Sequence, residues 1–342
     1  MYTIFKLGDG SIMLDTIKKL TSVFSVSGHE QKISKVIEEE IFPYVDTVEN
    51  DAMGNLIAFK KGLDSSKRVM IAAHMDEIGF IVTFIDDNGY IRVHNMGGIN
   101  PVACAFSRVK FENGTVGIIV PEGGTAPADL SVKKLIIDIG AKNKKEAEKK
   151  VKVGDVCALE NAYTRLMNNK IAVKALDDRL GCAVAIEAAK LALTPKYDTY
   201  YVFTVQEEVG CRGSKTGAFA VAPTYGIAID VTGTGDTVGA MPMAIKVGEG
   251  AAIKIKDSSV ICSKKIVDRL TLLAKDAKIP YQYEVLEYGG TDTSSMQTAA
   301  SGSYAGCVSI PTRYIHSAVE TVSLGDVDAC IKLIAEFVKN AD

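Results

Sequence analysis

The 342-residue chain lacks three features that would each indicate another class of protein. It has no apolar run approaching the ~20 residues of a membrane-spanning helix. Its first ten residues, MYTIFKLGDG, have none of the features of a signal peptide. Its formal net charge is only -3, which argues against nucleic acid or an anionic membrane as the main partner. We therefore expect a cytoplasmic protein that binds neither nucleic acid nor membranes.

Cysteine pairs are also missing, and histidine is scarce. The seven cysteines are scattered singly, form no CxxC pair and are odd in number, so we expect buried, reduced thiols rather than disulfides. The chain has only four histidines. We interpret His29, at the start of a predicted helix, and His94, in a β-rich region without suitable acidic neighbours, as surface residues.

Length and pattern predict two domains, one inserted in the other. Hydrophobic residues make up 47% and charged residues 24% of the chain, as in an ordinary globular enzyme. Residues 12–26 have helical spacing, and a second helix is expected to end at about Phe42. Residues 53–55 predict a hairpin turn. From Gly79 to about Val156, short alternating strands predict a small β-barrel or sandwich, with one longer helical candidate in the lysine-rich segment 143–151.

The most informative stretch is TYYVFTVQEEVG, residues 199–210. Its apolar run predicts a buried strand that ends abruptly in Glu207 and Glu208. Two like charges ~4 Å apart repel by roughly 4 kcal/mol at an effective dielectric of ~20, so a cation should compensate them. Because successive strand residues point to opposite faces, we expect the two glutamates to have different roles. Ligands bind at the carboxyl ends of strands in open α/β sheets, which is where this pair is expected.

Other predicted strands end in similar residues. Val69–Ala73 leads to His74 and Asp76, which lie two apart and so share a face, as suits a metal-bound imidazole supported by a carboxylate. A strand through residue 175 leads to Asp177 and Asp178 at a helix start. Acids are favoured there as caps, but two in succession exceed what capping requires.

Two further strand ends, at Asp230 and His316, complete the set. Their joint placement at one edge of one sheet is hard to explain without metal. Imidazole and carboxylate donors suit zinc, or borderline ions such as cobalt and manganese. Five ligands are too many for one tetrahedral ion with an open position, yet they suit two ions if one carboxylate, which we expect to be Asp177, bridges them. The five strand ends carry His74, Asp177, Glu207 with Glu208, Asp230 and His316.

Six ordered blocks resemble those of the tetrahedral aminopeptidases, a di-metal family of glutamyl and deblocking aminopeptidases that includes proteins labelled cellulase-M-like. The resemblance covers essentially the whole chain, and the six blocks in order make it highly specific. The blocks are AAHMDEIGF (72–80), VKALDDRLG (173–181), VQEEVGCRG (205–213), AIDVT (228–232), GGTDTSSMQ (289–297) and PTRYIHSAVE (311–320).

The resemblance implies a fold and a division into domains. The fold would be α/β, with a central mixed sheet flanked by helices, as in zinc aminopeptidases, and an inserted small β-barrel or PDZ-like domain. Residues 1–78 and 164–342 would form the discontinuous catalytic domain. Residues 79–163 would form the insert, which mediates dimer contacts and assembly into a hollow dodecamer.

The resemblance also implies a role for each site residue. Glu207 would be the general base, and Asp76 would support His74. A non-proline cis peptide bond would join Asp177 and Asp178. Two metal ions per subunit are implied, one held by His74, Asp177 and Asp230, and the other by Asp177, Glu208 and His316.

The expected function is removal of amino-terminal residues from oligopeptides. Two ions about 3.5 to 4 Å apart would activate a water and polarise the scissile carbonyl, while Glu207 takes the water's proton and delivers it to the leaving amine. The block after Asp292 departs from the family pattern and leaves the side-chain preference open, and Ala318 is a second departure. Alternatives are a metal-dependent deacylase of N-acyl amino acids, a metal-free glycoside hydrolase with carboxylates ~5 to 10 Å apart, and a non-catalytic scaffold.

Overall fold

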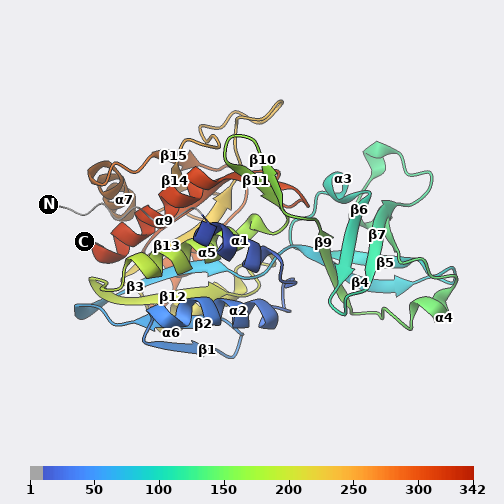
Figure 1. Ribbon diagram of the computed structural model, residues 1–342, viewed down its shortest axis with the longest axis horizontal. Helices are drawn as coiled ribbons and strands as arrows, with labels where there is room; N and C mark the ends of the chain where they lie inside the picture. Colours follow the sequence, from blue (N-terminus) through green and yellow to red (C-terminus); the bar gives the residue numbers. More distant parts are fainter. Residues whose placement is uncertain (1–10) are drawn as a thin grey trace.

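The computed structural model describes residues 11–342, in which two β structures of different kinds lie side by side (Figure 1). The larger is a mixed sheet of eleven strands covered by helices, and the smaller is a closed barrel of six strands. The α/β fold with a mixed sheet and an inserted barrel is therefore confirmed. The alternative of a sandwich is wrong, because the six small strands close on themselves.

Four parallel strands form the centre of the large sheet. The order across the sheet is β1-β2-β12-β3-β13-β16-β17-β11-β10, with β14 beside β16 and β15 beside β14. Strands β12, β3, β13 and β16 are parallel neighbours. The strands are β1 (Thr47–Asn50), β2 (Leu56–Lys60), β3 (Asp64–His74), β10 (Thr164–Leu166), β11 (Lys170–Val173), β12 (Tyr197–Thr204), β13 (Tyr225–Thr232), β14 (Ala251–Lys256), β15 (Tyr281–Val285), β16 (Tyr304–Arg313) and β17 (Glu320–Ser323).

Helices cover both faces of this sheet. On one face, α5 and α9 pack against each other and α5 lies on β3 and β13. On the other face, α6 lies on β12 and β3, and α8 lies on β13 and β16. The helices are α1 (Ser11–Thr21), α2 (Gln31–Ile41), α5 (Leu176–Leu191), α6 (Arg212–Val221), α7 (Lys264–Asp276), α8 (Thr293–Thr298) and α9 (Leu324–Lys339), with a 3-10 turn at η1 (Phe42–Tyr44).

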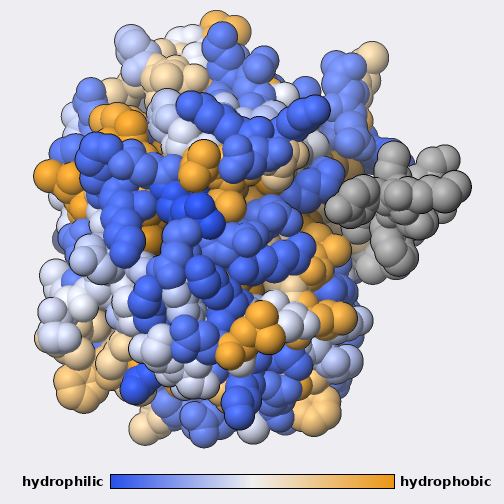
Figure 2. All heavy atoms as spheres, turned by 90° about the vertical axis from the view of Figure 1, so that its left-hand side faces the viewer, coloured by the Kyte–Doolittle hydropathy of each residue, from blue (hydrophilic) through white to orange (hydrophobic). Residues whose placement is uncertain are grey.

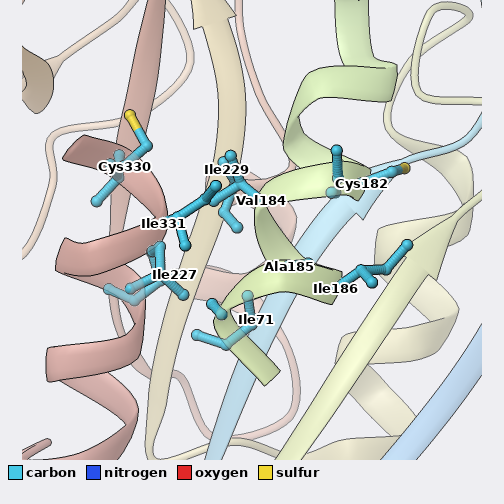
Figure 3. Close-up of a cluster of buried hydrophobic side chains, with 14 of the residues drawn as sticks. Ile71, Cys182, Val184, Ala185, Ile186, Ile227, Ile229, Cys330 and Ile331 are labelled. Carbon is cyan, nitrogen blue, oxygen red and sulfur yellow. The ribbon is translucent and has the colours of Figure 1, made fainter. Parts of the chain in front are cut away.

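The core follows from the alternation of side chains along strands that are buried on both sides. Ile71 of β3 and Ile227 of β13 belong to the main core cluster, under α5 and α9. Figure 3 shows these two side chains beside Val184 of α5 and Ile331 of α9. Ala228, the residue after Ile227 in β13, belongs to a second cluster on the opposite face of the sheet. Both layers hold the central strands, and therefore their carboxyl ends, in fixed positions.

The barrel is antiparallel throughout and has its own hydrophobic core. It projects from one end of the larger body (Figure 1). Its strands close in the order β4-β5-β8-β7-β6-β9. The elements are β4 (Gly79–Ile85), β5 (Ile91–Met96), α3 (Pro101–Cys104), β6 (Ser107–Phe111), β7 (Val116–Pro121), η2 (Pro127–Asp129), η3 (Val132–Lys134), β8 (Leu135–Asp138), α4 (Lys144–Ala147) and β9 (Val156–Glu160).

Two predicted helices are shorter than expected. The helix predicted over residues 12–26 ends at Thr21. The guanidinium of Arg179 donates hydrogen bonds to the backbone carbonyls of Leu20 and Val23, which fixes the chain where it leaves the helix. In place of the helix predicted over residues 143–151, the structure has only the short helix α4, and the chain after it forms a tight turn. The hairpin turn at residues 53–55 is confirmed by the antiparallel pairing of β1 and β2.

Three strand ends also differ from the sequence prediction. Strand β3 begins at Asp64 rather than Val69 and ends at His74. Strand β11 ends at Val173, because Ala175 has a left-handed backbone with φ 54°. Strand β13 continues through Asp230 to Thr232, so that aspartate lies within the strand rather than after it.

The surface and the cysteines match the expectations for a globular protein with buried thiols. None of the helices in residues 11–342 is long and apolar enough to cross a membrane. On the face turned away from the barrel, hydrophilic residues predominate and hydrophobic ones form separate patches (Figure 2). All seven cysteines are free, and all except the half-buried Cys211 are buried. The prediction that these thiols are buried is therefore confirmed for six of the seven.

Candidate metal centre

A crevice opens at the carboxyl end of β3, where successive strands of the chain are added on opposite sides of the sheet. Strand β3 lies between β12 and β13, which follow it in the chain on opposite sides, and such switch points are where ligands bind in open α/β sheets. The ladder between β3 and β13 ends at the pair Ala72 and Ala228. His74 and Asp230 lie two residues further along their strands, on the same face of the sheet as Ala72 and Ala228, and they face the gap where the strands separate. Nε2 of His74 is 4.0 Å from Oδ1 of Asp230.

His74 is buried and held from both sides. Its backbone N–H donates to Oδ2 of Asp178 (3.2 Å), and its Nδ1 lies 3.0 Å from the backbone carbonyl of Asp76. A ring whose Nδ1–H donates to that carbonyl would present Nε2 as a free lone pair toward the crevice. Such backbone support is typical of imidazoles that bind metals.

Asp177 lies between the two imidazoles. One carboxylate oxygen, Oδ1, is 3.0 Å from Nε2 of His74, and the other, Oδ2, is 3.2 Å from Nε2 of His316. Asp177 precedes the regular part of α5, and its peptide bond to Asp178 is cis, as the resemblance implied. Strand β11 runs in the same direction as β16, since both are antiparallel to β17, and so it delivers Asp177 to the same edge of the sheet.

His316 and Glu208 face each other on the other side of Asp177. Nε2 of His316 is 3.2 Å from Oε1 of Glu208, and within residues 11–342 no hydrogen bond is made to that buried oxygen. His316 follows β16 with a left-handed backbone, φ 62°. The five residues expected to bind metal are therefore brought together within one crevice.

The premise that Glu207 and Glu208 alternate along a strand is wrong. Strand β12 ends at Thr204, and both glutamates lie in the loop that follows. They still diverge, because Glu208 groups with His74 and Asp177, whereas Glu207 lies against the thiol of Cys211, with Sγ 3.0 Å from Oε1. The loop, rather than the strand, separates the two carboxylates.

The carboxylate of Asp76 fixes this loop. It is fully buried and accepts hydrogen bonds from the backbone N–H of Glu207 (3.0 Å) and of Glu208 (3.2 Å), and from the hydroxyl of Ser27 (2.7 Å). Its Oδ1 is also 3.5 Å from Nδ1 of His74. Asp76 thus connects the first imidazole to the two glutamates.

Sequence reasoning missed several acids at this centre. The sequence predicts Asp178 only as a helix cap and as part of the cis peptide bond. It does cap α5, accepting from the N–H of Gly181 (3.1 Å), but its carboxylate also groups with His74 and Asp230. Glu320 holds two ligands in place, since it accepts from the N–H of Asp177 (2.9 Å) and of His316 (2.8 Å). Only their positions in the blocks 173–181 and 311–320 signalled them.

A second group beside the crevice was also missed. Glu207, Cys211 and Asp292 offer ligand-type atoms within 4.8 Å of one another. Asp292 is buried and accepts from the hydroxyl of Thr204 (2.5 Å), and its Oδ1 has no partner in the part of the chain that the structure describes. The other two histidines belong to neither group and do not line the crevice: His29 is half-buried and contacts Glu112 of the barrel, and His94 is exposed.

The electrostatics of the crevice favour bound cations. Burial raises the pKa of Glu208, and it raises the pKa values of Glu207 and Asp230 well above their usual range. Burial opposes the charge of His316, yet its contacts with Asp177 and Glu208 raise its pKa to about 12. Clustered acids of this kind ionise together only when positive charge is supplied. Together with the unpartnered oxygen of Glu208, this donor set fits divalent metal ions with nitrogen and oxygen ligands.

The crevice opens into a cavity of about 500 Å³. His74, Asp177, Glu207, Glu208, Asp230 and His316 all line it. Loops after β13 and β15 contribute apolar and glycine residues, and Gly98 of the barrel side contributes another part of the wall. The volume is within the ~300 to 1,000 Å³ usual for small-ligand sites.

Comparison with known proteins identifies the family. The family model of the M42 glutamyl aminopeptidases matches residues 54–333. A relative from Acetivibrio thermocellus, provisionally named as an aminopeptidase, is 47% identical over 95% of this chain and 98% of its own. An aminopeptidase structure from Desulfurococcus kamchatkensis matches with a TM-score of 0.93 and 36% identity, covering 96% of this chain and 95% of that one.

A third comparison concerns assembly. The TET1 peptidase of Pyrococcus horikoshii, which can assemble into a tetrahedron or a large octahedral shell, matches with a TM-score of 0.86 and 33% identity. The match covers 96% of this chain and 99% of that one. From the family match and these full-length similarities, the chain belongs to the M42 glutamyl aminopeptidase family and is a metal-dependent peptide hydrolase.

Proposed function

We propose that the chain is a di-metal aminopeptidase that removes amino-terminal residues from oligopeptides. The observation that carries this proposal is the position of Asp177, whose two carboxylate oxygens face His74 and His316 separately. A carboxylate that presents one oxygen to each imidazole is suited to bridge two ions. One ion would be held by His74, Asp177 and Asp230, and the other by Asp177, Glu208 and His316.

Zinc is the metal that this donor set suits best, with cobalt and manganese as alternatives that accept the same ligands. Asp178 is a further donor candidate for the first ion, because its carboxylate groups with His74 and Asp230. Bound ions of this kind supply a water of lowered pKa and polarise the carbonyl of the scissile peptide.

Glu207 is the group best placed to move the proton. It lines the cavity, its carboxylate is not among the five expected ligands, and burial raises its pKa well above the usual range, which increases its affinity for a proton. Glu207 would take a proton from the attacking water and deliver it to the leaving amine. The carboxylate of Asp76 would hold Glu207 in position by accepting a hydrogen bond from the backbone N–H of Glu207.

We further propose that residues 1–78 and 164–342 form the catalytic domain and residues 79–163 an assembly domain. The barrel strands run from Gly79 to Glu160, which supports this division. The barrel would mediate dimer contacts within a dodecamer, the assembly described for the similar structure PhTET1-12s.

Three other functions are less well supported. A deacylase of N-acyl amino acids could use the same ion pair, and it differs only in requiring a blocked amino group. A glycoside hydrolase needs no metal, which leaves the two imidazoles at this centre without a purpose. A non-catalytic scaffold would have no need to keep Glu207 beside the ligand set.

Metal content and substrate choice test the proposal together. Elemental analysis should find two divalent ions per subunit, and chelation should abolish cleavage until an ion is restored. Free peptides should be cleaved and their N-acetylated forms should not. Cleavage of acetylated peptides alone would indicate the deacylase, and full activity of metal-free protein would contradict the proposal.

A further inference from the structure

The wall of the cavity beside the metal centre carries no charge of its own among the residues that the structure describes. The charged side chains that line it are those already assigned to the centre or to proton transfer. Val231, Leu286, Tyr288 and Ile315 supply apolar and aromatic surface, and the remaining lining residues are glycine, hydroxyl or thiol residues. A side chain of the substrate that enters this space would therefore meet neutral surface.

Cations close to the wall in sequence are either exposed or already paired with acids. Arg212, next to the lining residue Cys211, is exposed and donates to Oε1 of Gln206 (3.3 Å). Lys254 is fully buried, with its Nζ 2.8 Å from Oε1 of Glu284 and 3.5 Å from Oδ2 of Asp257. The guanidinium of Arg313 pairs with Asp236 at 2.6 Å. Arg212, Lys254 and Arg313 do not line the cavity. An acidic substrate side chain would thus find no positive partner among these residues.

The same holds for carboxylates that could pair with a basic side chain. Asp257 and Glu284 are buried against Lys254, which offsets their charge. Glu287 lies between two lining residues, Leu286 and Tyr288, but is exposed and does not line the cavity. Asp292 groups with Glu207 and Cys211 but does not line the cavity. A basic substrate side chain in the cavity would therefore meet only the acids of the centre, for which it would compete with the metal ions.

Hydrogen bonds hold the apolar wall in place. The carboxylate of Asp257 accepts from the N–H of Ser259 (2.8 Å) and of Val260 (2.9 Å), which fixes the loop after β14. The N–H of Ser258 donates to the carbonyl of Gly289 (3.2 Å) and joins that loop to the loop after β15. The buried group around Lys254 therefore shapes the wall without charging it.

We propose that this cavity receives the first side chain of the peptide and selects uncharged apolar or aromatic side chains over acidic and basic ones. Leu286, Tyr288 and Ile315 are the specificity-determining contacts. Burying apolar surface against them is favourable, whereas an ionised side chain there is desolvated without a partner. The inference rests on the proposed aminopeptidase function, and it separates this chain from the glutamyl activity in the family's description.

The test compares aminoacyl p-nitroanilides of leucine, phenylalanine, glutamate and lysine with the zinc- and cobalt-loaded full chain. The values of kcat/KM for leucine or phenylalanine should exceed those for glutamate and lysine by about 100-fold or more, the scale at which sites discriminate mismatched groups. Glutamate or lysine substrates within tenfold of leucine would overturn the proposal.

A binding measurement separates this proposal from the proposed function. If no p-nitroanilide is cleaved, the aminopeptidase function fails, and titration calorimetry with leucinamide, glutamic acid α-amide and lysinamide still reports the preference of the cavity. Tightest binding of leucinamide supports the neutral cavity. Equal or tighter binding of either charged amide contradicts it.

Charge insertion gives the sharpest control. Leu286→Lys should raise the glutamate-to-leucine ratio of kcat/KM by about tenfold or more, because it places a cation on the wall. Leu286→Met, which keeps the wall apolar, should leave the ratio within about threefold. Tyr288→Lys, at a side chain that is 69% exposed and so tolerant of change, repeats the test at a second position. An unchanged ratio in both lysine variants would overturn the assignment of these contacts.

Discussion

His74 is supported more closely by the backbone of Asp76 than by its carboxylate: Nδ1 of His74 lies 3.0 Å from the carbonyl oxygen and 3.5 Å from Oδ1. The carboxylate mainly serves the loop after β12, where it accepts two backbone N–H groups. Asp76 is therefore a positioning residue for two parts of the centre at once.

Asp76→Asn should lower kcat by about 10- to 100-fold, the usual effect of losing a partner of a metal-site residue. The amide oxygen could still accept from one backbone N–H, but the new NH2 group would face the other, of Glu207 or Glu208, where an acceptor is needed. Activity and metal content of the purified variant are the measurements. Ser27→Ala, which removes only the hydroxyl bond to Asp76, is the matched control and should lose much less. Equal losses in both variants would refute the positioning of the loop by Asp76.

Glu207→Gln should keep both ions and the assembly but lower kcat by about 10²- to 10⁴-fold, because the amide cannot accept the proton. Steady-state kinetics, elemental analysis and size-exclusion chromatography check the three parts. A variant that retains more than about a hundredth of the activity would show that another group moves the proton.

Asp177→Asn and Glu208→Gln should differ in metal content. The first removes charge from the bridging position and should lower the affinity for both ions, whereas the second should weaken only the ion beside His316. Titration of metal-free protein with zinc, followed by calorimetry, counts the sites that remain. Identical stoichiometry in the two variants would be inconsistent with a bridge at Asp177.

Gly98→Ala should lower kcat although Gly98 has no side chain that could act in catalysis. A Cβ at this position would lie 2.9 Å from Nδ1 of His316, so the ring must move. Misplacement of a catalytic group by about 1 Å can cost about 10²-fold in rate. Gly123→Ala is the matched control in the barrel, since a Cβ there meets nothing within 4 Å. A Gly98→Ala enzyme with unchanged kinetics would show that His316 tolerates the shift.

Asp236→Asn should destabilise the fold in a pH-dependent way. Burial alone would raise the pKa of Asp236, but hydrogen bonds, chiefly from Arg313, hold it at about 2, against 3.8 for an ordinary aspartate. Because the folded-state pKa is depressed, the stabilisation is fully present above about pH 4 and declines as the pH falls toward 2. Allowing for partial exposure, it should amount to about 1 to 2 kcal/mol at pH 7.

Urea unfolding of the wild type and Asp236→Asn at pH 7 and pH 3 measures this contribution. The difference in the free energy of unfolding should shrink by about half at pH 3. Asp328→Asn, at an exposed ion pair on α9, is the control and should change stability little at either pH. A difference for Asp236→Asn that does not vary with pH would point to packing rather than charge.

The predictable part of the site was its set of ligand types. The buried parts of β3 and β13 are apolar in sequence, so His74, which ends β3, and Asp230, two residues before the end of β13, are conspicuous. Parallel strands bring their carboxyl ends to one edge, and this placed both residues in the same crevice. The barrel was also recognisable, because its alternating strands differ in pattern from the continuous apolar runs of the sheet.

Loop geometry was the part that sequence could not supply. Glu207 and Glu208 diverge because a loop separates them, and no periodicity describes a loop. Glu320 reaches Asp177 across 143 positions in sequence, a contact that depends on the pairing of β17 with β11. The early end of α1 depends on Arg179, which lies far along the chain and is fully buried. Tertiary contacts of this kind override local propensity.

The five expected ligands are drawn from positions 74 to 316, on segments that meet only when the large sheet has formed. An unfolded chain therefore has no comparable binding site, and the ions would select the folded state alone. By mass action, such binding stabilises the protein by about 2.7 kcal/mol when free metal is 100 times its dissociation constant. Metal supply would thus set the heat resistance and the lifetime of this enzyme as well as its catalytic rate.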